Sequence, residues 1–202
     1  KIANEHRRII FNGDNYTDEW VEQASKRKLP NIISTVASLE TLIEKENVSL
    51  FTKHSVLTDT ELRARAEIML EAYSMSINIE AMTMLNMARR QILPACVKYS
   101  SMLARAAQAT SAAGVDARQH KEMLEDICDL ISTMRNKIVQ LEKAVEKTKK
   151  ILDTTKKARF YRDDVILAMQ DLRKTADEME IIVDADLWPM PTYAEILFVK
   201  PQ

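Results

Sequence analysis

The stretch from Thr58 to Gly114 contains a single residue that interrupts α-helices, Pro94. Apolar side chains recur at helical spacing on both sides of this proline, so we expect it to kink one long helix near Arg90 without ending it. Thr58 and Glu61 have the spacing of a capping box, and Gly114 is the residue type that ends helices in the left-handed conformation. The 202 residues include only 2 glycines and 5 prolines, too few for the frequent turns of a β-protein. The sequence therefore predicts an all-α fold.

A second helical segment begins at Asp116 and has the most regular apolar pattern of the chain. Its heptad positions are Leu124, Ile127, Ile131, Met134, Ile138, Leu141, Val145, Thr148 and Leu152. A third segment repeats the spacing in Val165, Met169, Leu172, Ala176, Met179 and Val183, after a link placed near Thr154 to Arg159. Because the connection at Gly114 is short, the first two helices must run antiparallel. The sequence predicts an elongated antiparallel three-helix bundle over residues 58–185, with a long kinked first helix.

Residues 1–57 predict a small helical base for this bundle. In residues 1–30 the apolar run Ile9–Phe11 and a turn at Gly13 precede a short helix from Thr17 to about Lys28. Residues 31–57 predict further short helices, one over Thr35–Glu46 and one ahead of His54. We interpret residues 1–30 as the end of a preceding domain with a linker helix.

Residues 186–202 predict an extended tail, because its two prolines favour a polyproline-like path. Tryptophan and tyrosine offer large apolar faces with polar handles, the residue types that anchor interfaces. We expect the tail to dock near Trp20 or on another domain or subunit. The residues expected to dock are Trp188, Pro189, Pro191, Tyr193 and Phe198.

Composition and charge exclude several classes of protein. Lys and Arg number 29 against 30 Asp and Glu, so no long-range field gathers nucleic acid or an anionic membrane. The sequence contains no run of 18 apolar residues, so it predicts no membrane-spanning helix. Cys96 and Cys128 are far apart and are expected to be free thiols. We expect neither a nucleic-acid partner nor a membrane partner.

The chain shows no pattern of catalytic, cofactor-binding or metal-ligating residues. A di-iron site in a helical bundle requires a glutamate three residues before a ligand histidine. None of His6, His54 and His120 has a glutamate at that position. Neither a phosphate-binding glycine loop nor a G-x-S-x-G or H-E-x-x-H motif occurs. The sequence therefore predicts no active site.

Three further clusters are interpreted structurally. Glu67, Glu71 and Glu80 are expected to pair with Arg63, Arg65 and Arg89 on a solvated face. The basic residues of 143–162 are expected to attract the acidic segment 171–186. Five methionines suggest either an adaptable groove or, as we expect, core filling: Met69, Met75, Met82, Met84 and Met87.

Several longer motifs resemble type III glutamine synthetases. The run Arg8–Tyr16 followed by Trp20 resembles the end of that family's catalytic region. Four segments resemble its helical C-terminal region: Glu61–Tyr73, Ile77–Ala81, Ile92–Ala95 and Trp188–Tyr193. The resemblance extends over essentially the whole chain, with a departure at Lys28, where the family leads us to expect glycine.

The resemblance implies a parent enzyme that joins ammonia to glutamate with ATP and Mg or Mn, in a double-ringed cytoplasmic homo-oligomer. The catalytic motifs of that family lie upstream and map onto no residue here. The chain is then a non-catalytic C-terminal domain with a structural or assembly role, whose partner is the upstream catalytic domain of the same polypeptide. The sequence begins with Lys instead of Met, which agrees with the expectation of an upstream domain in the same polypeptide.

Two alternatives stay open from the residues alone. A free-standing coiled-coil adaptor explains the heptads and the charge pattern equally well. A regulatory bundle that binds a small ligand near Pro94 rests on the expected kink alone.

Overall fold

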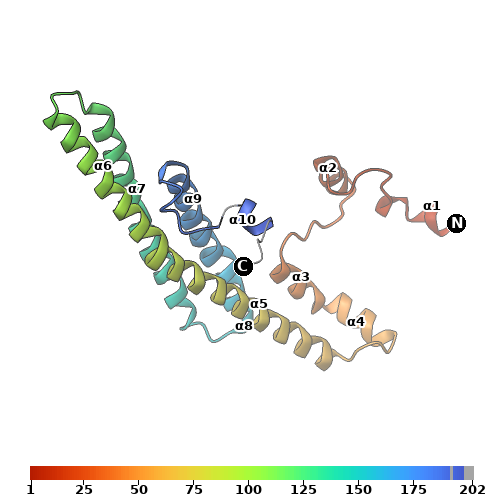
Figure 1. Cartoon of the computed structure of the whole chain (residues 1–202). Coiled ribbons are helices and arrows are strands. Elements are labelled where there is room, and N and C mark those ends of the chain that lie inside the picture. Colours follow the sequence, from red (N-terminus) through yellow and green to blue (C-terminus); the bar gives the residue numbers. More distant parts are fainter. Residues whose placement is uncertain (192, 198–202) are drawn as a thin grey trace. The chain divides into compact units, whose positions relative to one another are not determined.

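The computed structural model describes residues 1–191 and 193–197, and every regular element in this part of the chain is a helix. The predicted all-α class is therefore confirmed. The chain divides into two compact units, Lys1–Ala66 and Glu67–Gln202, each described here by itself (Figure 1).

The first unit consists of short helices followed by the start of a long one. They are α1 (Ile2–Glu5), a 3₁₀ turn (Arg7–Ile9), α2 (Asp18–Lys26), α3 (Thr35–Leu42), α4 (Lys45–Lys53) and the beginning of α5 (Asp59–Met87). The short helices expected after Thr17 and ahead of His54 are present. The helix expected over Thr35–Glu46 ends early, because Glu44 is extended and the Asn47 amide donates to the Thr41 carbonyl at 2.7 Å.

The apolar run before α2 is held to that helix by an aromatic and an arginine contact. The rings of Phe11 and Trp20 lie 4.8 Å apart between centroids, and the Arg27 guanidinium lies 5.7 Å from the Trp20 ring. Arg27 also donates to the carbonyl of Ile10 at 2.7 Å. These contacts explain why the sequence keeps an apolar segment and a tryptophan on either side of the Gly13 turn.

Three helices end on a residue with a positive φ angle. The angles are 58° at Lys28, 53° at Ser55 and 77° at Gly114. After Lys28, the Leu29 N–H donates back to the Ala24 carbonyl at 2.9 Å, the closure typical of a left-handed helix end. Lys28 is thus a non-glycine residue in a conformation that favours glycine, where the resemblance leads us to expect one.

The second unit contains the remainder of α5 and the longer elements that follow. These are a π-turn (Ala88–Ile92), α6 (Leu93–Ala112), α7 (Arg118–Thr148), α8 (Thr154–Phe160), a second π-turn (Tyr161–Val165), α9 (Ile166–Ile182) and α10 (Tyr193–Leu197). Pro94 has no N–H and its ring crowds the carbonyl four residues earlier, so the preceding turn widens into a π-turn and the helix continues. Gly114 ends α6 as predicted.

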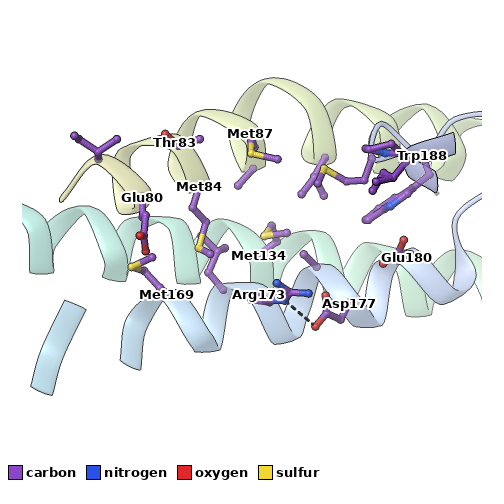
Figure 2. Close-up of a pocket in the computed structure, with 18 residues that line it drawn as sticks. Glu80, Thr83, Met84, Met87, Met134, Met169, Arg173, Asp177, Glu180 and Trp188 are labelled. Atoms are coloured by element: carbon purple, nitrogen blue, oxygen red, sulfur yellow. Dashed lines mark hydrogen bonds and ion pairs between the residues drawn. The ribbon is translucent and has the colours of Figure 1, made fainter. Parts of the chain in front are cut away.

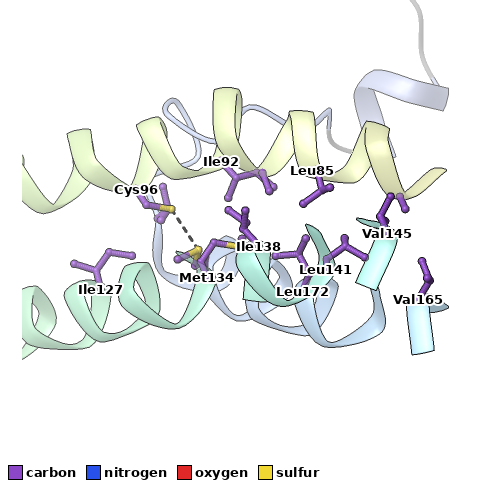
Figure 3. Packing of buried hydrophobic residues seen from close by; sticks show 14 of the residues in the cluster. Leu85, Ile92, Cys96, Ile127, Met134, Ile138, Leu141, Val145, Val165 and Leu172 are labelled. Carbon is purple, nitrogen blue, oxygen red and sulfur yellow. Dashed lines mark hydrogen bonds between the residues drawn. The ribbon is translucent and has the colours of Figure 1, made fainter. Parts of the chain in front are cut away.

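Helix α7 forms the centre of the second unit and packs against both α6 and α9. Its buried residues lie on the predicted heptad positions and meet residues of the other helices (Figure 3). The core includes Leu85, Ile92, Cys96, Ile127, Met134, Ile138, Leu141, Val145, Val165, Leu172 and Met179. Leu152 was wrongly assigned to this seam, since α7 ends at Thr148 and Leu152 is 93% exposed.

The link between α7 and α9 also lies earlier than predicted. Residues 149–153 are non-helical, whereas Thr154 and the residues up to Phe160 form α8. The Asp153 carboxylate accepts a hydrogen bond from the Lys156 N–H at 2.7 Å and so caps α8. The predicted link had no glycine or proline to mark it, and an aspartate N-cap marks its end instead.

The tail is not extended throughout. It leaves α9 through a turn at Ala185–Leu187 and stays non-helical over residues 188–191, as its prolines predict. Tyr193, which was expected in the extended part, begins the short helix α10.

Candidate functional site

A cavity of about 610 Å³ opens between α5, the first π-turn, α7, α9 and the tail of the second unit (Figure 2). We call it the methionine groove. Its lining residues are Ile79, Glu80, Thr83, Met84, Met87, Ala88, Ile92, Met134, Met169, Leu172, Arg173, Ala176, Asp177, Glu180, Trp188, Met190, Pro191 and Ile196. The size is that of pockets for small organic molecules, and the lining is mainly apolar with few polar groups.

Trp188 closes one end of the groove, opposite Glu80 and Met169 (Figure 2). Its side chain is half-buried and packs against the core of the second unit. The docking of the tail near Trp20, or on another domain or subunit, stays a prediction. The indole Nε1 of Trp188 is buried and has no hydrogen-bond partner among the described residues. A buried N–H donor without an acceptor is uncommon in proteins and calls for an explanation.

The other residues predicted to dock lie in or near this tail. Pro191 lines the groove, and Pro189 is half-buried beside Trp188. Tyr193 is the first residue of α10, and Phe198 lies outside the described residues. The tail therefore brings Trp188 and Pro191 to one wall of the groove, joined there by Met190 and Ile196, which the sequence did not single out.

The π-turn before Pro94 forms another part of the wall of the groove. Ala88 and Ile92 belong to this turn, Met87 immediately precedes it, and all three line the groove. Pro94 therefore affects the shape of the groove indirectly, because the π-turn that precedes it contributes lining residues. Pro94 itself is not a lining residue.

Charged groups lie at the rim of the groove, not in its apolar floor. Arg173 and Asp177 form an ion pair across one turn of α9, with Nε and Oδ2 3.5 Å apart. Glu80 and Glu180 are exposed carboxylates on α5 and α9. With Arg173 paired, the rim carries a net negative charge.

The methionines of α5 do not fill the core as expected. Met84 is half-buried beside the core and Met87 lines the groove, but Met69, Met75 and Met82 are 51%, 64% and 52% exposed. The expectation of core filling is wrong for these three because α5 is apolar on more sides than its neighbours cover.

Part of this exposed apolar surface forms a line along α5, which we call the α5 stripe. Its members are Ile68, Ala72, Met75, Ile79 and Met82, which follow one another at steps of three and four residues. Such spacing places them on one helix face, and all of them are exposed. A seam of this kind on a helix indicates a surface for another helix or domain. The sequence carried the signal in its continuous apolar periodicity, but the periodicity did not show which face is left uncovered.

The ion pairs differ from those expected. Arg63 pairs with Asp59 at 2.9 Å and Arg89 pairs with Glu142 of α7, whereas Glu67, Glu71 and Glu80 were expected as the partners. The wrong choice arises because helical spacing alone cannot account for an acceptor on a different helix.

The charge runs also lie differently than expected. Lys137 of α7 contacts Asp171 of α9 at 2.6 Å, and the Thr148 and Tyr161 hydroxyls are 3.1 Å apart, so the two segments run antiparallel. The basic residues near Thr148 therefore lie beside the basic residues of 156–162, and not beside the acidic residues of 177–186. The expected mutual attraction is therefore wrong, and Asp171 pairs instead with Lys137, which lies outside the predicted basic run.

Neither cysteine forms a disulfide, as expected. Cys96 is buried with its Sγ 3.5 Å from the Met179 Sδ, and Cys128 is exposed. Burial raises the pKa of the Cys96 thiol to about 11, so this thiol is not an activated nucleophile. Over residues 1–191 and 193–197, no three His, Cys, Asp or Glu side chains are grouped so as to hold a metal ion. A search of the same residues finds no helix with the length and apolarity that a membrane span requires.

Comparison with known proteins identifies the family. A family model described as the glutamine synthetase C-terminal domain matches residues 1–111. A glutamine synthetase of Butyrivibrio fibrisolvens is 36% identical over 96% of this chain, and a type-3 glutamine synthetase of Dictyostelium discoideum is 31% identical over 97%. A glutamine synthetase of Bacteroides fragilis is 27% identical over 95%. The chain spans about 28% of the length of the first two relatives. The chain therefore belongs to the glutamine synthetase C-terminal domain family, as its resemblance to type III enzymes predicted.

Proposed function

We propose that this chain is a non-catalytic, structural domain of a cytoplasmic glutamine synthetase and that it supports assembly of the enzyme's homo-oligomer. In this proposal the catalytic domain of the same polypeptide ligates ammonia to glutamate with ATP and Mg or Mn. The proposal assigns this domain a packing role, and among the described residues no group of three His, Cys, Asp or Glu side chains could hold a metal ion.

The α5 stripe is the observation that carries the assembly role. Ile68, Met75, Ile79 and Met82 are 64%, 64%, 62% and 52% exposed on a helix whose Ala81 and Leu85 are buried on a different face. Scattered exposed apolar residues need no explanation, but an ordered line of large ones marks an interaction surface. Burial of such a line against the catalytic domain or a neighbouring subunit yields about 25 cal/mol for each Å² removed from water.

Introducing charged residues into the α5 stripe of the full-length enzyme tests the assembly role. The double variant Ile68→Glu, Met75→Glu places two carboxylates in the stripe and leaves the core side of α5 unchanged. We expect a smaller particle in size-exclusion chromatography and lower synthetase activity, with unchanged helix content by circular dichroism.

Met69→Glu is the matched control, since Met69 is 51% exposed on the same helix but lies outside the stripe. The control is expected to keep the particle size and activity of the wild type. A double variant with wild-type particle size and activity would contradict the assembly role and leave the family assignment intact.

A further inference from the structure

We propose that a second cavity, between α5, the first π-turn and the end of α7, binds a small molecule that carries a phosphate group. The cavity has a volume of about 590 Å³ and lies within the second unit. We call it the arginine pocket. Of the described residues that line it, Met82 also belongs to the α5 stripe, and none lines the methionine groove.

The walls of the arginine pocket are rich in hydrogen-bond donors. Arg89, Arg90 and Lys149 contribute cationic donors, and Asn78 and Asn86 contribute amide groups. A guanidinium group can hold a phosphate through two parallel N–H bonds, and an ammonium group adds a compact positive charge. Such a lining is complementary to a ligand with several acceptor oxygens.

The first π-turn brings two consecutive arginines to the pocket. Arg89 and Arg90 both belong to the turn Ala88–Ile92, which precedes Pro94, and both line the cavity. Neighbouring residues of a regular α-helix point about 100° apart, whereas a π-turn follows a wider path. Single π-turns inside helices are frequent at functional sites. The alternative of a ligand site near Pro94 therefore has a definite position in this pocket.

The ion pairs of the lining leave an excess of positive charge. Arg89 pairs with Glu142 of α7, and the Lys149 Nζ lies 2.6 Å from the Glu146 Oε2, so each lining carboxylate already has a cation beside it. Arg90 is exposed and forms neither an ion pair nor a hydrogen bond with another described residue. The unpaired guanidinium therefore attracts an anion more strongly than the neutralised carboxylates repel it.

Exposed lysines strengthen this preference on the α7 side. Lys143, Lys147 and Lys150 each directly follow a lining residue in sequence, and none of them pairs with an acidic side chain among the described residues. Charges of one sign around a cavity raise the local concentration of a ligand of opposite sign. The charge of the pocket therefore selects an anion.

A buried hydrogen bond fixes one of the neutral donors. The Asn78 Oδ1 accepts from the Tyr161 hydroxyl at 3.2 Å, and this hydroxyl lies 3.1 Å from the Thr148 Oγ1. With its oxygen engaged, the Asn78 amide keeps its Nδ2 N–H groups for a ligand. A phosphate group has three strong acceptor oxygens and a carboxylate only two, so donors from several residues favour phosphate.

The test compares three probes of similar shape: glycerol 3-phosphate, the carboxylate glycerate and uncharged glycerol. Each is titrated at constant ionic strength into the ¹⁵N-labelled 202-residue chain, and the backbone amide signals of residues 88–92 report binding. We expect glycerol 3-phosphate to shift these signals saturably and to bind at least about fivefold more tightly than glycerate. Glycerol is expected to give no saturable shift.

Two variants locate the site without changing a residue of the α5 stripe. Arg90→Gln removes the unpaired guanidinium and is expected to weaken glycerol 3-phosphate about tenfold or more. Asn86→Asp keeps the shape of the side chain but adds a carboxylate, and it is expected to weaken the same probe. Both residues are exposed, so helix content by circular dichroism should be unchanged.

Arg105→Gln is the matched control, because Arg105 is an exposed arginine of α6 that lines neither cavity. It is expected to leave the affinity within about twofold of the wild type. Absence of a saturable shift with glycerol 3-phosphate would overturn the binding site. Equal losses in Arg90→Gln and Arg105→Gln would overturn its location, and glycerate binding as tightly as the phosphate would overturn the ligand class.

Discussion

The hydroxyl of Tyr161 donates to the Oδ1 of Asn78 at 3.2 Å, which joins the second π-turn to α5 across 83 positions of sequence. The same hydroxyl lies 3.1 Å from the Thr148 Oγ1 at the end of α7. Tyr161 is only 4% exposed and Thr148 3%, and the Thr148 hydroxyl also donates to the Val145 carbonyl at 2.7 Å. Helix α5, the end of α7 and the second π-turn are thus joined by hydrogen bonds at one buried point.

Tyr161→Phe is expected to lower the free energy of unfolding by about 1–3 kcal/mol, because it removes the hydroxyl and leaves buried polar partners behind. Urea denaturation followed by circular dichroism measures the change. A double-mutant cycle with Asn78→Ala should give less than additive losses, since either change breaks the same bond. Strictly additive losses would show that the bond does not couple the two segments.

Ile138→Asp is expected to cost several kcal/mol, on the order of 3–5, because it buries an unpaired carboxylate in the heptad seam. Ile138 is 3% exposed and packs in the core of the second unit. Gln140→Asp is the control at an exposed position of the same helix and should change stability by at most about 0.5 kcal/mol. Thermal melts that rank the two variants equally would disprove the seam.

Lys28→Gly and Ser55→Gly are each expected to stabilise the protein by about 0.5–1 kcal/mol. Both residues hold positive φ angles, of 58° and 53°, which cost a residue with a Cβ more than they cost glycine. Lys26→Gly, inside α2, is the matched control and should destabilise by about 0.5–1 kcal/mol. Denaturant midpoints measure the change in stability. An unchanged midpoint for Lys28→Gly would show that Lys28 does not hold a positive φ angle in solution.

The capping box of α5 predicts a dependence of stability on acid. The Thr58 N–H donates to Glu61 Oε2 at 2.8 Å, the Thr58 hydroxyl donates to the same oxygen at 2.8 Å, and the Glu61 N–H donates to Thr58 Oγ1 at 3.3 Å. The backbone hydrogen bond contributes most and the hydroxyl bond next, and together they lower the pKa of the Glu61 carboxyl below its ordinary value of 4.5. A lowered folded-state pKa means that the stabilisation is present above pH 4.5 and is lost as the pH falls through the folded value.

Glu61→Gln keeps a capping side chain but cannot titrate, so the variant is expected to lose less stability than the wild type below pH 4.5. Thermal melts of both proteins across that range measure the difference. Glu67→Gln, which alters an exposed carboxyl of α5 outside the capping box, serves as the control and should follow the wild type. Identical acid profiles for Glu61→Gln and the wild type would remove the cap as a source of the pH dependence.

The amino-acid sequence determined the helices whose signals are local. The capping residues at Thr58 and Glu61, the glycine at position 114 and the heptads of α7 each act within one or two helical turns, and the structure contains them as predicted. The family could also be identified from the sequence alone, because long motifs such as Glu61–Tyr73 are recognised without knowledge of their contacts in the folded chain.

Packing alone decided what the apolar surface of each helix does. Helix α5 is apolar on several faces, so only the approach of other helices determines that Leu85 is buried while Met75 stays exposed. The groove likewise requires the turn after α9, which returns Trp188 to the core. Hydrophobic burial has no direction of its own, and a chain with more apolar surface than its core can cover leaves that choice to the tertiary structure.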